Sequence, residues 1–389
     1  MASRFPSNRV AIVGIGATEF SKQSGRSELQ LATECIRSAL ADAALRPEQV
    51  DGMTTFVQDT SAEIDIARNL GIPELRFFAR VPYGGGAGGG AVALAVLALE
   101  NGLADVVVVY RAFNERSGTR FGQPVTPRPT SDGINMSWYS SFGLATPAGF
   151  VAMAARRYMH LYGATSEDYG RVAVASRKHA ATNPKAWFYQ RPITLAEHQA
   201  SRWIVEPLHL LDCCQESDGG VALVLTRLDR ARDLPQRPAL VTAAAQGSAA
   251  GQETMTSYTR PDIAQLPEIN LVGRQLWAQS GLTPADIDTA ILYDHFTPLV
   301  LEQLEDLGFC ARGEARHFIA NGAIEIGGRL PVNPHGGQLG EAYIHGMNGI
   351  AEAVRQIRGT AANQVSDCRN VLVTAGTAVP TSGLILQAP

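Results

Sequence analysis

The feature that most limits what this chain can fold into is a seven-residue pattern, Leu-x-Pro-x-x-Val/Ile-Asp, that occurs twice. It stands at Leu45–Asp51 and again at Leu282–Asp288. In both places a helical stretch comes before the pattern. An extended segment, a glycine-rich turn, a second helix and an apolar strand then follow in the same order. Because a whole order of elements returns, we expect two copies of one structural unit.

Each copy alternates strands with helices, which predicts an α/β fold with helices on the faces of a parallel sheet. The apolar residues of the expected helices recur at helical spacing, most clearly between 27 and 44. The expected strands and extended segments cover 9–14, 52–56, 105–110, 237–243, 290–294 and 370–374. The expected helices cover 27–44, 91–100, 268–280 and 350–358.

The length of 389 residues is too great for one ordinary core. A charged run at 230–237 is typical of a linker and predicts an N-terminal half over 1–232 and a C-terminal half over 233–389. The first half carries an insertion from about 112 to 206, and an insertion of this size in an α/β unit usually covers the site. Three basic residues mark its start: Arg111, Arg116 and Arg120.

The composition excludes several classes of protein. The net charge of −4 gives no electrostatic reason to expect nucleic acid. No apolar run reaches the roughly 18–20 residues of a membrane-spanning helix, so no membrane span is expected. The eight histidines lack the spacing of a metal site, so no metal is expected. The five cysteines lack CxxC spacing, which excludes a disulfide scaffold and a zinc ribbon and favours a reducing, cytoplasmic location.

Two glycine-rich stretches do not fit a nucleotide site. Gly14 and Gly16 follow a strand, but Glu19 stands where a dinucleotide fingerprint has its third glycine. The run Gly84–Gly90 lacks the Gly-Lys-Ser/Thr of a P-loop. What remains is a glycine turn at the start of a helix, whose N–H groups suit an anion or a developing oxyanion. Close helix packing is the alternative explanation, and both can hold.

Four motifs resemble the thiolase superfamily, and most of all its sterol-carrier/lipid-transfer branch. They are VAIVGIGATEF at 10–20, LDCCQESDGG at 211–220, YDHF at 293–296 and NPHGGQLGEAYIHG at 333–346. The resemblance covers essentially the whole chain. It implies a duplicated thiolase-type αβαβα five-layered fold with an inserted loop domain in the first half. It also implies a homodimer and an acyl-CoA substrate, with coenzyme A as part of the substrate and no separate cofactor.

The catalytic residues that the resemblance implies are replaced in this chain. Gly85 stands where the family has its nucleophilic cysteine, Tyr343 where it has a histidine, and Tyr293 where it has an asparagine or histidine. The second catalytic cysteine corresponds roughly to Val373. Claisen exchange needs a thiolate that forms an acyl-enzyme, and Gly85 has no side chain to acylate. The cysteines of the LDCCQ motif are interpreted as structural: Cys213 and Cys214.

Two tyrosines at former catalytic positions suit acid–base chemistry. A phenol has an ordinary pKa of about 10, so it acts as a base only if donors or cations stabilise its phenolate. Tyr343 is the candidate base and Tyr293 the candidate acid, although the sequence does not fix their order. His295 and His345 each lie two residues beyond a tyrosine, on the same face of a strand, and either tune it or fill polar space. The turn at Gly85 and Gly86 is the candidate oxyanion site.

A subgroup of this superfamily, the thiolase-like aldolases of bacterial steroid side-chain degradation, is similar in replacing its Cys and His with Gly and Tyr. That resemblance implies retro-aldol cleavage of a β-hydroxyacyl-CoA, a 17-hydroxy steroid-22-oyl-CoA, to a 17-ketosteroid and propionyl-CoA. It also implies a partner, the OB-fold domain of a companion enoyl-CoA hydratase.

Two other functions stay open. One is a non-catalytic protein that lost catalysis when it lost its cysteine. Such a protein would be an acyl-CoA or lipid carrier, or a scaffold for a hydratase partner. The other is a thiolase that uses a cysteine outside the family position. Cleavage of a β-hydroxyacyl-CoA separates a lyase from a carrier. The sequence favours the lyase because the lost residues became tyrosines, which can transfer protons.

Overall fold

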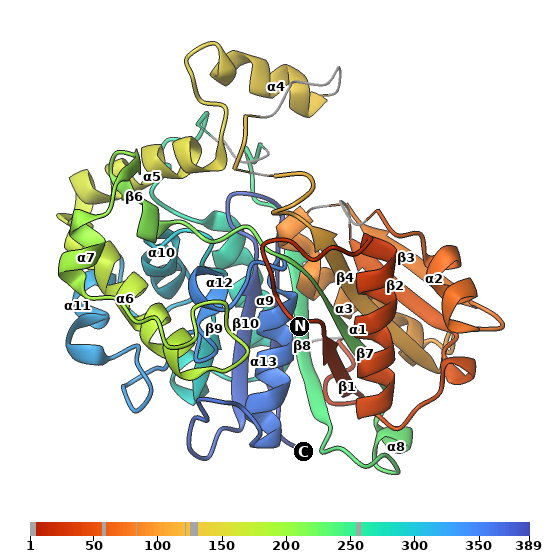
Figure 1. The fold of residues 1–389 in the computed structure, drawn as a ribbon. Coiled ribbons are helices and arrows are strands. Elements are labelled where there is room, and N and C mark those ends of the chain that lie inside the picture. The colour runs from red at the N-terminus through yellow and green to blue at the C-terminus, as the bar shows by residue number, and fades with distance from the viewer. Residues whose placement is uncertain (1–4, 57–59, 83, 121, 125–130, 254–257) are drawn as a thin grey trace.

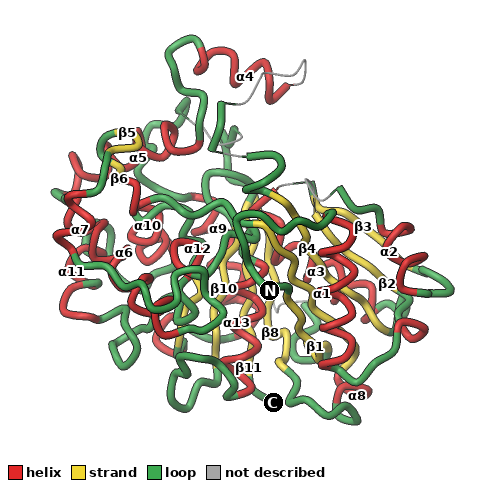
Figure 2. The backbone as a smooth tube through the Cα atoms, in the orientation of Figure 1, coloured by secondary structure: helices red, strands yellow, loops and turns green. Residues whose placement is uncertain are grey.

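The computed structural model describes residues 5–56, 60–82, 84–120, 122–124, 131–253 and 258–389. In this part of the chain, nine strands form one mixed sheet in the order β3-β2-β4-β7-β1-β8-β11-β10-β9. Figure 2 shows these strands side by side through the centre of the molecule. The strands are β1 (Val10–Ala17), β2 (Gly52–Phe56), β3 (Phe77–Val81), β4 (Val106–Asn114), β7 (Asp218–Arg227), β8 (Ala239–Gly247), β9 (Thr289–Ile291), β10 (Asn370–Ala375) and β11 (Thr381–Gln387).

The strand order is mirrored about the β1–β8 pair. On one side it reads β1-β7-β4-β2, and on the other β8-β11-β10-β9. The outer pairs β2–β4 and β9–β10 are parallel, whereas β4–β7, β7–β1, β10–β11 and β11–β8 are antiparallel. Both halves therefore share one connectivity, which is the duplication expected from the repeated element order. The exact boundary at 232/233 stays a prediction.

The repeated seven-residue pattern forms the same structure in both halves. Its proline opens a short 3₁₀ helix, η1 (Pro47–Gln49) in the first copy and η4 (Pro284–Asp286) in the second. The closing aspartate then binds a neighbouring strand. Asp51 accepts hydrogen bonds of 2.9 Å from the two backbone N–H groups that open β4. Asp288 does the same at the start of β10, at 2.8 Å. The pattern therefore recurs because it connects a helix to the start of a strand in each half.

The helices and sheet halves form five layers, separated by three clusters of buried apolar residues. One cluster joins α1 (Glu28–Asp42) to the outer face of the N-terminal half of the sheet. A second joins α3 (Gly88–Glu100) and α13 (Met347–Arg358) to strands of both halves, so these helices form the central layer. The third places α9 (Pro267–Ser280) and α10 (Pro298–Asp306) on the outer face of the C-terminal half. The predicted αβαβα arrangement is confirmed.

The chain between β4 and β7 forms a separate group of helices. In Figure 1 this group, coloured yellow to green, lies over the C-terminal half, with α4 projecting from the body. Helix α6 packs on α12, and α5 contacts α10. β4 reaches Asn114, so the first residues of the expected insertion belong to a strand. The helices and strands of this group are α4 (Ser131–Ser140), α5 (Pro147–Tyr162), α6 (Ser166–Thr182), α7 (Leu195–Ala200), β5 (Trp203–Val205) and β6 (Leu208–His209), whereas α12 (Gly337–Gly340) belongs to the C-terminal half.

The glycine turn of the first half is shorter than expected. Residues Gly84–Ala87 form a 3₁₀ turn, η2, and α3 already begins at Gly88 instead of at 91. Tyr83, the first residue of the expected turn, lies outside the described residues. Glycine is a poor helix former, but a Cβ at Gly89 would come within 3.0 Å of the backbone of Gly383 on β11. Close approach to the sheet therefore explains glycine in the first turn of the helix.

The remaining short elements join these layers and do not carry the site. They are the helices α2 (Glu63–Leu70), α8 (Leu228–Ala231) and α11 (Ala315–Phe318), and the 3₁₀ turns η3 (Leu210–Asp212) and η5 (Ala320–Gly322). Over the described residues, no helix combines the length and the apolar character needed to cross a membrane.

Candidate active site

The two tyrosines singled out from the sequence meet in the structure. Tyr293 lies two residues beyond the end of β9, and its backbone N–H donates to Thr374 Oγ1 on β10 at 2.9 Å. Tyr343 lies in the turn between α12 and α13, and its backbone N–H donates to Ser217 Oγ at 3.2 Å. The two phenol oxygens are 2.9 Å apart, with the rings 6.2 Å apart and inclined by 69°. The fold thus brings both hydroxyl groups into one hydrogen bond.

Gly85 lies directly beside this pair. A Cβ atom at Gly85 would be 2.0 Å from Tyr293 Oη and 3.1 Å from His345 Cδ2. The phenol of Tyr293 therefore fills the space that a side chain at position 85 would need. A side chain at position 85 and the Tyr293 phenol in this position therefore exclude each other sterically. At Gly86 a Cβ would come within 1.9 Å of the carbonyl oxygen of Pro380, so this position also excludes a side chain.

His345 is held as a neutral ring. Its Nδ1 lies 3.3 Å from Nε and 3.1 Å from Nη2 of Arg111, and a guanidinium group only donates hydrogen bonds. Burial and the charge of Arg111 lower the pKa of His345 well below its usual value. The Arg111 guanidinium in turn lies over the rings of Phe56 and Phe113, at 5.1 and 4.7 Å. Arg111 was expected at the start of the insertion, but it is buried in β4 at 0% exposure.

His295 is also neutral. Its ring packs against that of Tyr293 at 4.9 Å, and its Nε2 lies 3.4 Å from Thr377 Oγ1. Burial lowers the pKa of His295 to about 3. Both histidines therefore pack beside the tyrosines without adding positive charge near pH 7, which leaves Arg111 as a cation behind His345. The two roles expected from the sequence, tuning of the tyrosines and filling of polar space, stay predictions.

The tyrosines themselves are neutral phenols in this environment. Burial raises the pKa of Tyr293, and it raises that of Tyr343 well above the usual value. Their shared hydrogen bond lowers the pKa of Tyr293 and raises that of Tyr343, as expected if Tyr343 donates to Tyr293. Arg111 also lowers the pKa of Tyr293. The site can therefore pass a proton between two phenols, but burial disfavours a phenolate at either position.

Near the pair, Ser217 and Glu115 were missed from the sequence, whereas Cys214 was interpreted as structural. Cys214 donates its backbone N–H to the carbonyl of His295 at 2.8 Å, and burial raises its thiol pKa well above the usual value. Ser217 supports the backbone of Tyr343. Glu115 is buried one residue beyond β4. The available signal for Glu115 was its spacing of four residues from Arg111, which places both charged residues on one face of an extended strand.

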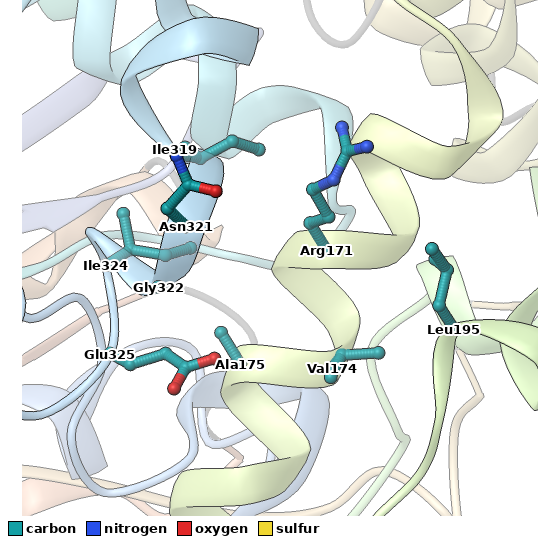
Figure 3. Close-up of a pocket in the computed structure, with 9 residues that line it drawn as sticks. All are labelled: Arg171, Val174, Ala175, Leu195, Ile319, Asn321, Gly322, Ile324 and Glu325. Carbon is teal, nitrogen blue, oxygen red and sulfur yellow. The ribbon is translucent and has the colours of Figure 1, made fainter.

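Two cavities lie away from the tyrosines. One, of about 190 Å³, is formed between α6 and residues 319–325. Figure 3 shows Arg171 and Ala175 on α6 across from Asn321 and Glu325, and neither tyrosine lines this space. The other, of about 40 Å³, lies between α5 and residues 258–268. Within the described residues, no cluster of three or more His, Cys, Asp or Glu side chains can hold a metal ion.

Comparison with known families identifies the class of protein. Residues 10–229 match the family described as thiolase, N-terminal domain, and residues 249–387 match the family described as thiolase C-terminal domain-like. The chain therefore belongs to the thiolase family, and the expected resemblance is confirmed.

Two related proteins and one solved structure show which kind of thiolase-family member this chain is similar to. The chain is 69% identical over 381 residues to the steroid side-chain-cleaving aldolase of Thermomonospora curvata, covering 97% of each chain. It is 65% identical over 383 residues to the 17-hydroxy-3-oxo-4-pregnene-20-carboxyl-CoA lyase of Mycobacterium tuberculosis, covering 98% of this chain and 99% of that one. The solved structure of the Ltp2-ChsH2(DUF35) aldolase superposes with a TM-score of 0.96 at 68% identity, over 99% of both chains.

Proposed function

We propose that this chain is a lyase that cleaves a carbon–carbon bond of a steroid acyl-CoA by a retro-aldol reaction. The substrate is a β-hydroxyacyl-CoA, a 17-hydroxy steroid-22-oyl-CoA, and the products are a 17-ketosteroid and propionyl-CoA. The observation that carries this proposal is the 2.9 Å contact between Tyr293 Oη and Tyr343 Oη, beside a glycine where a thiolase would have its nucleophile. The aldolase and lyase named above are relatives at 69% and 65% identity.

The hydrogen-bonded phenols support a proton relay. Tyr343, which is only partly buried, takes the proton of the β-hydroxyl group as its own proton passes to Tyr293. The hydroxyl oxygen becomes the ketone oxygen, and the electron pair of the broken bond passes to a thioester enolate. As it accepts the proton of Tyr343, Tyr293 gives its own phenol proton to the α-carbon of the enolate, so both phenols are neutral again at the end of the reaction. Because burial disfavours a phenolate, a relay in which each phenol donates as it accepts suits this site.

The enolate oxygen needs hydrogen-bond donors. The turn at Gly84–Ala87 leads into α3, whose first backbone N–H groups have no partner within the helix. Gly85 in this turn adjoins Tyr293, so donors from Gly85 and Gly86 would lie close to the reacting carbon. Fixed backbone donors at a developing oxyanion are a strong source of transition-state stabilisation. Coenzyme A enters as part of the substrate.

Product analysis tests the lyase against the carrier and scaffold alternatives. The chain, co-expressed with an OB-fold hydratase domain, is incubated with 17-hydroxy steroid-22-oyl-CoA, and propionyl-CoA is measured by mass spectrometry. A lyase forms equal amounts of propionyl-CoA and 17-ketosteroid, and the Tyr293→Phe/Tyr343→Phe double variant binds the substrate without cleaving it. Binding without cleavage by the unmodified chain would instead identify a carrier. The lyase is favoured because the two former catalytic positions meet as proton-transferring groups.

The same proposal includes two protein partners. We infer a homodimer because β3 (Phe77–Val81) ends the sheet in the described part of the chain and exposes 58% of Phe78. A monomeric mass by light scattering at micromolar concentration would contradict this. The second partner is the OB-fold domain of a companion hydratase, supported by the name of the related Ltp2-ChsH2(DUF35) aldolase. Failure of the two chains to co-purify after co-expression would argue against it. The cytoplasmic location remains a prediction from the sparse cysteines.

A further inference from the structure

Glu115 is a buried acid to which the proposed reaction assigns no role. It follows β4 by one residue, and because Asn114 pairs with Asp218, Glu115 comes opposite Ser217. Its side chain is 1% exposed. Neither carboxyl oxygen has a hydrogen bond of normal geometry to any residue that the structure describes, although the backbone of Ser217 lies near enough to favour the charged form. Such a group is costly to bury and is uncommon without a role.

The strand geometry directs Glu115 toward the tyrosines. Alternate residues of a strand share one face, so Arg111, Phe113 and Glu115 lie on the same side of β4 and its extension. Arg111 contacts His345 Nδ1, and the ring of Phe113 lies 6.3 Å from the His345 ring. The next position on that face, Glu115, comes opposite Ser217, whose hydroxyl oxygen accepts from the backbone of Tyr343. Glu115 therefore borders the space that holds the pair.

We propose that Glu115 is a positioning residue of the tyrosine pair: its carboxyl group controls whether the two phenols can take part in proton transfer. This inference rests on the retro-aldol function proposed above and adds a third ionisable group to its site. Glu115 acts through the phenols and needs no contact with the substrate. Its protonated form permits the relay between Tyr343 and Tyr293, and its ionised form suppresses that relay.

Several charged or titratable groups face Glu115. They are Arg111 on β4, Lys22 before α1, Cys214 and Glu216 before β7, and the tyrosines Tyr293 and Tyr343 of the C-terminal half. Burial and the charge of Glu216 raise the pKa of Glu115 well above its usual value, against the opposing effects of Arg111 and Lys22.

Lys22 is a limited counter-charge. Its Nζ donates to Gln215 Oε1 at 2.8 Å and to the carbonyl of Glu216 at 2.5 Å, and burial lowers its pKa to about 8. It therefore loses its charge as the pH rises through about 8, and its stabilisation of a Glu115 carboxylate weakens there.

The sign of the coupling follows from these charges. The Glu115 carboxylate raises the pKa of both Tyr293 and Tyr343, because a nearby negative charge makes each phenol a weaker acid and so hinders the donation of its proton within the relay. A protonated Glu115 removes this effect. Turnover should therefore be high while Glu115 holds its proton and should fall as the pH rises through its pKa. Since one proton is lost, the fall should be about tenfold per pH unit above that point.

The test compares pH profiles of turnover in the complete complex. Glu115→Gln keeps the shape of the side chain and cannot ionise, so the alkaline fall assigned to Glu115 should be absent. Glu115→Asp should retain a fall, at a shifted pH. Glu302→Gln is the matched control: Glu302 is 0% exposed on α10, and neither of its carboxyl oxygens has a partner among the described residues. This control should keep the wild-type profile.

A second measurement does not depend on activity. With tyrosine labelled by ¹³C at Cζ, the NMR signals of Tyr293 and Tyr343 are assigned from their Tyr→Phe variants. In the wild type these signals should shift through the titration of Glu115, and in Glu115→Gln that shift should vanish. Identical pH profiles and identical ¹³C titrations for the two proteins would overturn the role of Glu115. Full activity of Tyr293→Phe and Tyr343→Phe would instead overturn the retro-aldol site itself, so the two failures are distinguishable.

Discussion

The phenol oxygens of Tyr293 and Tyr343 lie 2.9 Å apart, although the two residues are 50 positions apart in the chain. Each is fixed from a different part of the fold: Tyr293 by β10, and Tyr343 by the segment that precedes β7. The contact is short enough for a proton to pass between the two oxygens. It can therefore supply the acid–base chemistry of the proposed retro-aldol reaction, which requires no covalent intermediate.

Removing either phenol hydroxyl should stop cleavage without unfolding the protein. Loss of one proton-transfer group typically lowers the rate by about 10²–10⁴, so Tyr343→Phe and Tyr293→Phe should each reduce turnover by at least about 10². Phenylalanine keeps the ring packing, so affinity for the acyl-CoA should change little. Steady-state measurement of propionyl-CoA release tests this.

A third tyrosine is the control for that experiment. Tyr169 is fully buried and donates to the carbonyl of Ala155 at 3.1 Å, away from the candidate site. Tyr169→Phe should lower the free energy of unfolding by about 1 kcal/mol and leave turnover nearly unchanged. Equal losses of turnover in Tyr169→Phe and Tyr343→Phe would argue for a general structural effect of lost hydroxyl groups.

A methyl group at position 85 should displace the Tyr293 phenol. The added Cβ of Gly85→Ala would be 2.0 Å from Tyr293 Oη, so the variant should lose both stability and turnover. In the Tyr293→Phe background the same substitution should cost less stability, because the closest atom is gone. A double-mutant cycle of unfolding free energies measures this coupling. Strict additivity of the two substitutions would contradict the steric link between Gly85 and Tyr293.

Much of the fold could be predicted because its physical causes are local. The repeated pattern at Leu45–Asp51 and Leu282–Asp288 marks short 3₁₀ turns in which the final aspartate caps the start of a strand. Such a pattern is visible in the sequence. The layer arrangement and the two tyrosine positions were carried by the resemblance to a known family. The start of α3 was placed three residues late, because close approach to β11 favours glycine at Gly89 against its low helix propensity.

The parts of the site that the sequence did not reveal depend on distant contacts. Arg111 was interpreted as part of a basic cluster, but its partner His345 lies 234 positions away and is absent from any local pattern. Glu115 was missed because the expected insertion was placed from about 112, which hid the continuation of β4. Strand β7 (Asp218–Arg227) was noticed only for the motif before it, and β11 (Thr381–Gln387) was not expected. The available signal was the four-residue spacing of Arg111 and Glu115, which places both on one face if the strand continues to 115.

The cysteines of the LDCCQ motif should be dispensable for cleavage. Burial raises the pKa of Cys213 to about 12, and it raises the pKa of Cys214 well above its usual value, so neither is a thiolate near pH 7. Cys213→Ala and Cys214→Ala should each keep turnover within a few-fold of the wild type. Intact-protein mass spectrometry during turnover should show no acyl adduct. An acyl-cysteine that forms in the wild type and disappears in either variant would contradict this prediction and support a thiolase-like mechanism.

Asp294 should make the stability of the protein depend on pH. It is fully buried beside Tyr293, its Oδ1 accepts the backbone N–H of Gln338 at 2.8 Å, and burial raises its pKa from 3.8 to about 6. The folded state therefore binds this proton more tightly than the unfolded state, so the stabilisation is complete below about pH 3.8 and is lost as the pH rises through 6.

The variant Asp294→Asn tests this, because its side chain cannot lose a proton and keeps the oxygen that accepts the hydrogen bond. Relative to wild type, its unfolding free energy should rise by up to about 3 kcal/mol between pH 4 and pH 7, measured by chemical denaturation. Asp286→Asn is the sign control: hydrogen bonds from Thr283 lower the pKa of Asp286, so its difference from wild type should be nearly constant between pH 4 and pH 7 and should change in the opposite sense only below about pH 4. A constant difference between Asp294→Asn and wild type across this range would show that Asp294 is already ionised at pH 4.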